Sequence, residues 1–475
     1  MTRSSPEHTS HVTQPQAQNG GSAEGQTGDV FEPSGSSEAD QAVGYGAVLK
    51  NHLFLLIWAA QLLSQTAQNV INFAVVVEVE RLTQSSTNVS WVIVSFSLPA
   101  ILLGPLAGVF VDRTSKRAVL LWTNILRALL MLAFLLAPIT LQSVYAMTFA
   151  ASAVSQFFLP AEGAMIPLIV RRRELMTATS LFNLTFTGAQ VAGFVLVGPL
   201  LYKIFGDRSF DIAVVGVIVM YSLAAACVAA IRKPEPIQGT VWQAVRRAMN
   251  VVHVWKDMLE TRRFVGRAPG LTLAITHLTL ATAMLMAVAT LGPGFVNRVL
   301  GLGAEDTGYI LAPAGVGMIA STALLGQFAV NADRRILAGS GLLAMGILLV
   351  ALGYIRPVFN AVFGEPGGAG TLMPGELIGF IAIVCIITAL LGVAFSLVTI
   401  PAQTLVTEAT EESIRGRVFA LLFMLTQTAS AVPVVVVGVL ADTLGIVPML
   451  ASIGVLVSLV GLWTFRSLAA SDRTQ

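Results

Sequence analysis

The sequence of 475 residues carries little charge: Asp, Glu, Lys and Arg make up 11% of it, against 55% hydrophobic residues. Its mean hydropathy is +0.77. A water-soluble domain needs more charge than this to cover its surface, so the composition excludes a soluble globular protein. The net charge of +2 also gives no reason to expect a nucleic-acid partner. The chain is expected to lie in a membrane.

Cysteine and catalytic motifs are also scarce. The two cysteines, Cys227 and Cys385, fall in separate apolar segments, which excludes a disulfide framework, and we expect neither a metal site nor a cofactor. The sequence contains no Gly-x-x-x-x-Gly-Lys-Ser/Thr, His-Glu-x-x-His or Gly-x-Ser-x-Gly motif. We therefore do not expect an enzyme or an on-chain ATPase, and the energy for any transport must come from a gradient.

Long apolar runs are what the sequence has in abundance. A bilayer core of roughly 30 Å needs about 20 helical residues to cross it, and these runs are too long for barrel strands. The sequence predicts an all-α membrane protein with twelve transmembrane helices, near residues 53–77, 89–111, 118–137, 142–166, 175–204, 210–231, 270–297, 306–330, 336–355, 376–400, 415–441 and 446–466.

Lysine and arginine are concentrated in every second connection between these spans, including 113–117, 171–173, 334–335 and 415–417. Positive charge is retained on the cytoplasmic side of membrane proteins, which predicts that both termini are cytoplasmic. The connection at 232–268 is long, and its spacing of valines among basic residues predicts either an amphipathic helix on the inner membrane surface or a solvated linker helix.

The two halves of the sequence resemble each other. Pro160-Ala161 before the fifth span corresponds to Pro401-Ala402 before the eleventh, and Asp112-Arg113 corresponds to Asp333-Arg334. Parallel repeats of this kind predict two pseudo-symmetric six-helix bundles with a substrate site between them. The expected domains are a disordered cytoplasmic tail, a first bundle, a cytoplasmic linker, a second bundle and a short tail, at 1–47, 48–231, 232–268, 269–468 and 469–475.

The connection after the second span carries a recognisable motif. Gly108-Val109-Phe110-Val111-Asp112-Arg113-Thr114-Ser115-Lys116-Arg117 resembles the loop 2–3 motif of the major facilitator superfamily, with Ser115 where the family favours glycine. The Pro160-Ala161 segment and the segment 415–421 are similar to the branch of enterobactin exporters and macrolide efflux proteins. The resemblance covers about residues 48–468.

This resemblance implies a multi-pass secondary transporter of the cell membrane, the inner membrane of a bacterium, that works by alternating access. It also implies efflux of lipophilic drugs or siderophore-like compounds, with antiport as one mode and a proton as a candidate coupling ion. A metabolite or lysophospholipid permease is an alternative. A non-transporting membrane receptor on the same scaffold is another.

Charged residues near the ends of the spans predict a gate. The family resemblance implies that Asp112 meets the start of the eleventh span and closes the inner mouth, and the repeat assigns Asp333 the same role against Arg171–Arg173. These charges would otherwise serve only as topology signals. The predicted gating residues are Gly108, Asp112, Arg113, Lys116, Arg117, Asp333, Arg334, Arg415 and Arg417.

Polar side chains recur at helical spacing in the first, fifth and seventh spans. Lipid does not tolerate such stripes cheaply, so they must face other helices or a watery chamber. Any one stripe could serve interhelical hydrogen bonding alone, whereas three together favour a neutral polar substrate chamber. Its predicted lining is Gln61, Gln65, Gln68, Asn72, Asn183, Thr187, Gln190 and Thr276.

Arg127, Glu162 and His277 are ionisable residues that lie away from the ends of their spans. Arg127 stands ten residues past Arg117, about 15 Å deep at the helical rise of 1.5 Å per residue, and Glu162 lies at a similar depth in the next span. They are predicted either as a structural pair or as a proton-coupling pair. His277 could titrate near neutrality, but a lone histidine in a span is more often a packed hydrogen-bonding group.

Overall fold

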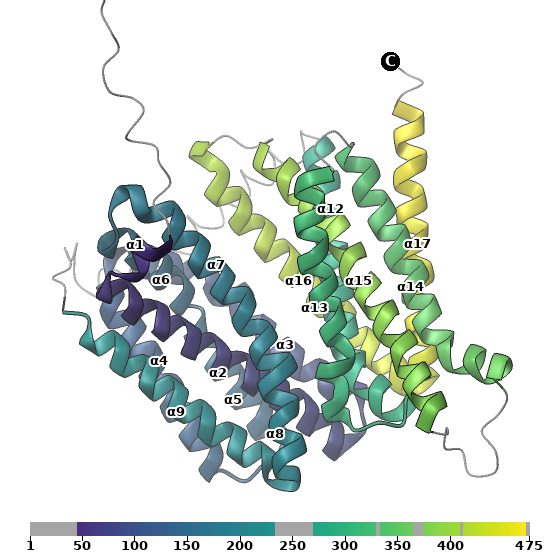
Figure 1. The fold of residues 1–475 in the computed structure, drawn as a ribbon, viewed down its shortest axis with the longest axis horizontal. Coiled ribbons are helices and arrows are strands. Elements are labelled where there is room, and N and C mark those ends of the chain that lie inside the picture. Colours follow the sequence, from purple (N-terminus) through teal and green to yellow (C-terminus); the bar gives the residue numbers. More distant parts are fainter. Residues whose placement is uncertain (1–44, 233–268, 329–332, 364–373, 409–411, 472–475) are drawn as a thin grey trace, which may run out of the picture. The chain divides into compact units, whose positions relative to one another are not determined.

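A computed structural model of the chain describes residues 45–232, 269–328, 333–363, 374–408 and 412–471. Within these ranges every regular element is a helix (Figure 1). The expected all-α fold is therefore confirmed. The predictions for the tail 1–47 and the linker 232–268 fall almost entirely outside the described residues.

Residues 45–232 contain the first six predicted spans. The α-helices are α1 (Tyr45–Leu49), α2 (His52–Thr83), α3 (Ser86–Arg113), α4 (Lys116–Leu136), α5 (Leu141–Ser155), α6 (Phe158–Ile169), α7 (Leu175–Val191), α8 (Gly198–Phe205) and α9 (Ser209–Ala230). Shorter 3-10 and π segments join them, namely η1 (Arg172–Glu174), η2 (Ala192–Val197) and η3 (Gly206–Arg208).

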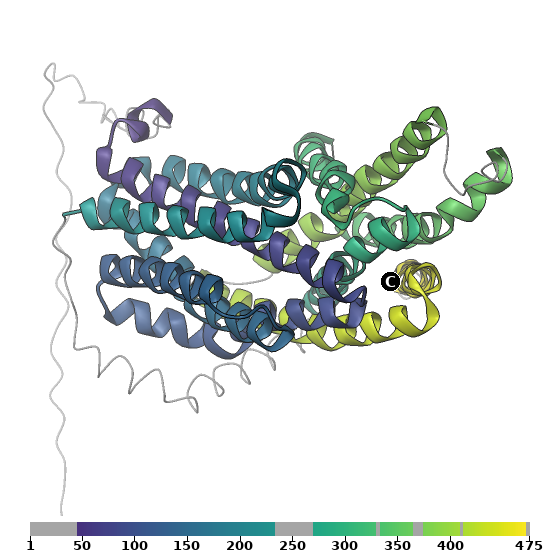
Figure 2. The same cartoon turned by 90° about the horizontal axis from the view of Figure 1, so that it is seen from below.

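Residues 269–471 contain the other six spans, in the green to yellow part of Figures 1 and 2. The helices are α12 (Pro269–Gly294), α13 (Thr307–Phe328), α14 (Arg334–Phe363), α15 (Pro374–Glu408), α16 (Glu412–Leu444) and α17 (Ile446–Ser471), with the short segments η4 (Phe295–Val299) and η5 (Ala304–Asp306).

Side-chain caps fix where several helices begin. The side chain of Asn51 accepts hydrogen bonds from Leu53 N and Phe54 N at the start of α2. Ser115 accepts one from Ala118 N at the start of α4. The serine that departs from the family motif therefore supplies an N-cap, which satisfies a backbone donor that glycine would leave to water.

Two spans contain breaks that apolar length does not reveal. The fourth span divides into α5 and α6 at residues 156–157. In the fifth span the π segment η2 lies against α2, where a Cβ on Gly193 would come within 2.6 Å of Asn69 Cβ and one on Gly198 within 2.4 Å of the Phe73 ring. Only glycine allows this close approach, so these two residues set the packing of η2 on α2.

The same helix pairs pack in both halves. Pairs α4 and α9, α3 and α5, and α2 and α7 correspond by order to pairs α14 and α17, α13 and α15, and α12 and α16. One hydrophobic core is centred on residues such as Phe73 and Val77 and also includes Ala304 and Val434 of the second half, and another, within the second half, is centred on Leu342 and Leu349. The repeated pairing is the structural counterpart of the repeat in the sequence.

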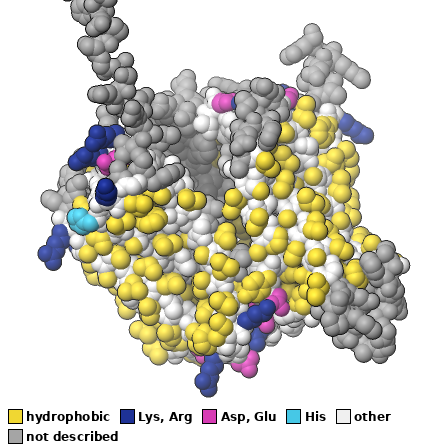
Figure 3. Space-filling model, in the orientation of Figure 1, with side chains coloured by type: hydrophobic (Ala, Val, Ile, Leu, Met, Phe, Trp, Pro, Cys, Tyr) yellow, Lys and Arg dark blue, Asp and Glu magenta, His cyan; other side chains and the backbone are white. Residues whose placement is uncertain are grey.

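The outer surface suits a bilayer. Large apolar side chains such as Trp122 and Val432 are exposed, and Figure 3 shows hydrophobic side chains over the middle of one face, with charged ones near its two ends. In the described part of the chain, nine helical segments are long and apolar enough to cross a membrane. Helix α2 is not among them, in keeping with the amide side chains that lower its hydropathy.

Candidate functional site

The two halves meet through polar side chains at the end of the helices where α2 is followed by α3, here called the α2–α3 end. The carboxylate of Asp442, near the end of α16, accepts hydrogen bonds from the start of α3. Its donors are Ser86 N (2.8 Å), Thr87 N (2.9 Å), Ser85 Oγ (2.7 Å) and Thr87 Oγ1 (2.7 Å). A helix N-terminus carries partial positive charge, so it binds a carboxylate favourably.

Arg298, at the end of η4, completes this junction. Its Nε lies 3.2 Å from Glu80 Oε1, its Nη1 lies 3.4 Å from Asp442 Oδ1, and its Nη2 donates to Ser86 Oγ at 2.6 Å. The guanidinium therefore joins α2, α3 and α16. We call Glu80, Arg298 and Asp442, with the α3 N-terminus at 85–87, the interhalf clasp.

Glu80 has no solvent exposure. It lies in the last turn of α2, beyond the span predicted at 53–77, and faces Arg298 and Asp442. Burial raises the pKa of Glu80 to about 7, while the Arg298 charge acts in the opposite direction. The buried carboxylate is thus the costly member of the clasp.

Two further contacts between the halves lie at the same end. Lys203 of α8 lies 3.7 Å from Asp306 and 4.8 Å from the centre of the Tyr309 ring, across the halves. Gly438 of α16 faces α3 so closely that a Cβ there would come within 2.7 Å of Ser86 O. Both halves are therefore in tight contact at the α2–α3 end.

The predicted gating residues lie at the opposite end, where α3 is followed by α4. Asp112 is exposed, and in the part of the chain described here no ion pair to its carboxylate is present. Lys116 donates to Asp112 O (3.0 Å) and Thr114 O (3.2 Å), and Arg117 donates to Ala229 O (2.7 Å) at the end of α9. The motif loop is thus held within its own half.

The partners predicted for these gate charges are not all described. The side chains of residues 412–421, including Arg415 and Arg417, lie outside the described residues, so the contact of Asp112 with α16 stays a prediction. Asp333 accepts a hydrogen bond from Arg335 N at 2.8 Å, which caps α14, and Arg334 pairs with Glu408. A Cβ on Gly108 would meet nothing within 4 Å.

The amides of α2 are engaged with neighbouring helices. Gln61 Nε2 donates to Phe182 O (3.1 Å), while Gln61 Oε1 is buried without a partner. Gln68 Nε2 donates to Asn72 (2.9 Å), and Gln68 Oε1 accepts from Ser155 (2.9 Å) and Tyr221 (3.2 Å). For Gln68, these contacts fit the interpretation that the polar stripe serves interhelical hydrogen bonding. Gln65 is half-buried.

The other predicted chamber residues are more exposed. Asn183, Gln190 and Thr276 are all exposed, and Thr276 donates to Thr272 O at 2.9 Å. The side chain of Thr187 is outside the described residues. The contacts of the described residues do not join these side chains into one chamber, so the chamber stays a prediction.

Arg127 and Glu162 are both buried inside the first half, with exposures of 2% and 3%. The Arg127 guanidinium stacks between two rings, 4.6 Å from the centre of Phe158 and 4.9 Å from that of Tyr221. One terminal nitrogen of Arg127 and the Oε1 of Glu162 are buried without a hydrogen-bond partner. Arg127 Nε donates to Thr123 O at 3.3 Å, and the two aromatic faces add contacts that favour guanidinium over ammonium.

His277 is 2% exposed and its Nε2 lies 3.1 Å from Thr464 Oγ1 of α17. This position is that of a packed hydrogen-bonding group within the second half. It does not bring His277 near Arg127 or Glu162, which lie in the first half.

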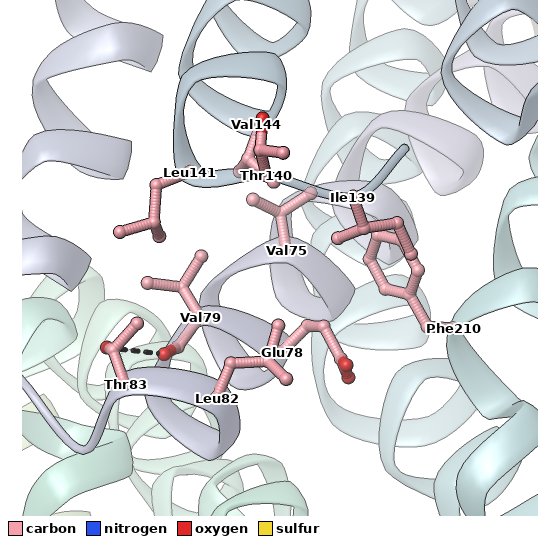
Figure 4. Close-up of a pocket in the computed structure, with 10 residues that line it drawn as sticks. All are labelled: Val75, Glu78, Val79, Leu82, Thr83, Ile139, Thr140, Leu141, Val144 and Phe210. Carbon is pink, nitrogen blue, oxygen red and sulfur yellow. Dashed lines mark hydrogen bonds between the residues drawn. The ribbon is translucent and has the colours of Figure 1, made fainter. Parts of the chain in front are cut away.

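The cavities described in the structure are small. One of about 110 Å³ lies among α2, α5 and α9 near the α2–α3 end, lined by Val75, Thr140, Phe210 and other apolar residues, with Glu78 at its edge (Figure 4). A drug-sized ligand needs about 300–1,000 Å³. This cavity is therefore not the predicted substrate chamber.

Sequence reasoning missed the interhalf clasp. None of Glu80, Arg298 and Asp442 is among the site residues predicted from the sequence. A signal was available, because Glu80, Arg298 and Asp442 all stand where predicted spans end on the same side. Nothing in the sequence alone pairs them, however.

Repeated helix pairs with an apolar outer surface define a polytopic helical membrane protein. The sequence matches the Major Facilitator Superfamily over residues 57–364, and the chain belongs to this superfamily. It is thus a membrane transporter of the major facilitator type. Over 399 residues it is 26% identical to the uncharacterized MFS-type transporter YfiS of Bacillus subtilis (strain 168), a match that covers 83% of this chain and 88% of that protein.

Solved transporter structures share the fold. A POT family transporter in complex with 5-aminolevulinic acid aligns with a TM-score of 0.67 at 9% identity, covering 87% of this chain and 95% of that one. A variant of the nucleoside transporter NupG aligns with a TM-score of 0.66 at 12% identity, covering 87% and 100%. At such low identity these likenesses concern the fold alone.

Proposed function

We propose that the chain is a secondary active exporter of lipophilic drugs or siderophore-like compounds, which works by alternating access in the cell membrane of a bacterium. Membership of the superfamily supports transport. The similarity of the Pro160-Ala161 and 415–421 segments to efflux proteins supports export. Alternating access is supported by one observation: the halves are joined through charged groups at one end of the helices. Such groups can be hydrated when the halves move apart, so the junction can open and close.

The orientation of the chain follows from its charges. Basic connections at 113–117, 171–173 and 334–335 lie at the α3–α4 end, which favours a cytoplasmic position for that end and for both termini. The α2–α3 end then faces outward. The contacts of Asp442 and Arg298 in this orientation support an outer-closed arrangement of the carrier.

We assign the gating of the inner mouth to Asp112 and the motif at 108–117. In the outward-open state the Asp112 carboxylate binds the start of α16 and Arg415 or Arg417, and in the outer-closed arrangement it is released to solvent. Asp112 is exposed in this structure, which supports its release to solvent in the outer-closed arrangement. Asp333 acts in the same way in the second half, although its present contact is with its own helix.

The substrate chamber lies between the halves, with exposed polar groups such as Asn183, Gln190 and Thr276 on its wall. Their neutral amides and hydroxyls suit an uncharged or amphipathic solute. Coupling to protons uses Glu162, whose buried and partly unsatisfied carboxyl stands near Arg127 in the first half.

Transport by purified protein tests this function. Inverted vesicles containing the full chain are given labelled lipophilic drugs, siderophores, lysophospholipids and polar metabolites, with and without a pH gradient. Accumulation of drugs or siderophores supports the proposal, and dependence on the gradient supports antiport. Accumulation of metabolites or lysophospholipids alone would favour a permease for those solutes. Binding without any transport would favour a receptor.

A further inference from the structure

The hydrogen bonds to Asp442 have an unusual origin. Within the described ranges, this carboxylate on α16 satisfies the backbone donors of Ser86 and Thr87 at the start of α3, although α3 belongs to the other half. Ser85 caps its own helix by accepting from Asn88 N and also donates to Asp442. A helix terminus in one half is therefore completed by a side chain from the other.

Arg298 links the same groups to a third helix. It contacts Glu80 on α2, Ser86 on α3 and Asp442 on α16. The hydrogen bonds that Asp442 accepts from the start of α3, at 2.7–2.9 Å, are short and charge-assisted. Arg298 and Glu80 form an ion pair at 3.2 Å. All of these groups can be hydrated individually if the halves separate, so the contact is reversible in a way that an apolar interface is not.

The packing around these groups leaves room for little else. The surrounding apolar side chains include Val89 and Val92 of α3 and Val434 of α16, all buried in one cluster. Gly438 is needed for the close approach of α16 to Ser86 and Ser90. While these contacts are formed, they hold the two halves tightly together at the α2–α3 end.

We propose that Asp442, Arg298 and Glu80, with the N-terminus of α3, form a releasable clasp that closes the outer mouth and must open in each transport cycle. Asp442 is its main anchor because it makes the most hydrogen bonds. Arg298 orients Asp442 and Glu80, and all three are positioning residues that do not touch the solute. The clasp rests on the proposed alternating-access function, which it deepens by naming the outer gate.

Distances between the halves test the clasp without any transport. The full chain with Cys227 and Cys385 replaced by alanine carries spin labels at Leu82 and Leu444, two exposed residues near the clasp on opposite halves. Pulsed spin-resonance distances in nanodiscs report the outer-open fraction. The variant Asp442→Asn should raise the ratio of outer-open to outer-closed molecules about tenfold, the effect expected from losing charge-assisted hydrogen bonds.

The matched control is Asp207→Asn, which breaks the exposed pair of Asp207 with Arg81 at the same end but inside one half. It should leave the distances unchanged. Unchanged distances in Asp442→Asn, or an equal change in both variants, would overturn the clasp.

A covalent lock covers the case in which Asp442→Asn folds poorly. Thr87 Oγ1 and Asp442 Oδ2 are 2.7 Å apart, so cysteines at both positions lie within reach of a disulfide after a small shift. Oxidation of Thr87→Cys/Asp442→Cys should hold the outer-closed distance and stop transport, and reduction should release the outer end and restore transport. Transport that continues through the oxidised protein would overturn the clasp.

The clasp and the proposed transport function can be disproved separately. If distances respond to Asp442→Asn but no solute is transported, the clasp stands and the proposed transport function is wrong. If solutes are transported while distances do not respond, transport stands and the clasp is wrong.

Discussion

Glu80 is the residue in the clasp whose charge responds to pH. Its pKa is raised to about 7 in the closed arrangement, where it faces Arg298 and Asp442, and it should return toward the ordinary glutamate value once the outer end opens to water. The closed arrangement therefore binds the proton more tightly. Between those two pKa values, lowering the pH favours the closed arrangement, and raising it through 7 favours opening.

We predict that the outer-open fraction falls as the external pH is lowered from 8 to 6. The shift in the open-to-closed ratio should approach about tenfold, because the ratio changes by a factor of ten for each pH unit between the two pKa values and pH 6 lies about one unit below the pKa of the closed arrangement. Glu80→Gln cannot ionise, so it should remove this dependence and keep the low-pH ratio throughout. The Leu82–Leu444 distance measures the outer-open fraction at each pH. A pH response that survives in Glu80→Gln would rule out the Glu80 carboxyl as the source of the response.

Glu162 is the residue on which proton coupling depends. Its carboxyl is buried beside Arg127, and one of its oxygens lacks a hydrogen-bond partner. We predict that Glu162→Gln still binds and equilibrates the solute but no longer accumulates it against a concentration gradient when a pH gradient is applied. Vesicle transport with and without the pH gradient measures both quantities.

The matched control for this prediction is Glu78→Gln, which neutralises a half-buried glutamate at the end of α2 outside the proposed site. It should leave accumulation as in the unaltered chain. Gradient-driven accumulation by Glu162→Gln would show that Glu162 and Arg127 are a structural pair only.

At the level of elements, α13 and α15 pack through backbone contact. A Cβ on Gly392 would lie 1.9 Å from Ala314 O, and one on Gly317 would lie 2.0 Å from Ala389 O. We predict that Gly392→Ala lowers the free energy of unfolding by about 1–3 kcal/mol, as overpacking does, because the clashing atom is backbone and cannot rotate away. The midpoint of thermal unfolding in detergent measures the change.

Gly379→Ala is the control on the same helix, because a Cβ there would meet nothing within 4 Å. Alanine has the higher helix propensity by about 1 kcal/mol, so Gly379→Ala should leave stability unchanged or raise it. Equal destabilisation by both variants would mean that the loss at residue 392 does not come from the α13–α15 contact.

Apolar length and charge predicted the helices well, because a bilayer constrains both directly. The predicted span 89–111 is α3 and the predicted span 306–330 is α13. The sequence did not predict the break at 156–157 or the π segment η2, since these depend on how Gly193 and Gly198 fit against α2. Spacing also predicted that the amides of α2 face other groups, but their partners depend on tertiary packing.

The candidate site was less predictable than the fold for the same reason. Glu80, Arg298 and Asp442 lie far apart in the sequence, and only the packing of α3 on α16 brings them together. The motif at 108–117 could be recognised because its residues are contiguous. A junction made from the ends of separate helices leaves no contiguous pattern to recognise.

At the scale of the whole molecule, the two ends of α3 should control opposite mouths. Asp442 binds the first turn of α3 and Asp112 stands in its last turn, about 40 Å apart at 1.5 Å per residue. Each carboxylate is assigned to a contact that exists in one state only. The two halves then move as rigid bodies between states stabilised at opposite ends.

We predict that Asp112→Asn raises the outer-closed population, since it weakens the contact that closes the inner mouth, whereas Asp442→Asn lowers it. The double variant should lie near the unaltered chain, because effects of sites so far apart usually add within about 0.5 kcal/mol. Label distances at Leu82–Leu444 for the outer end and Arg232–Ile336 for the inner end measure all four proteins, with Asp207→Asn as the control. If Asp112→Asn opened the outer end, or if the double variant resembled Asp442→Asn alone, the motif at 108–117 would not act as the opposing gate.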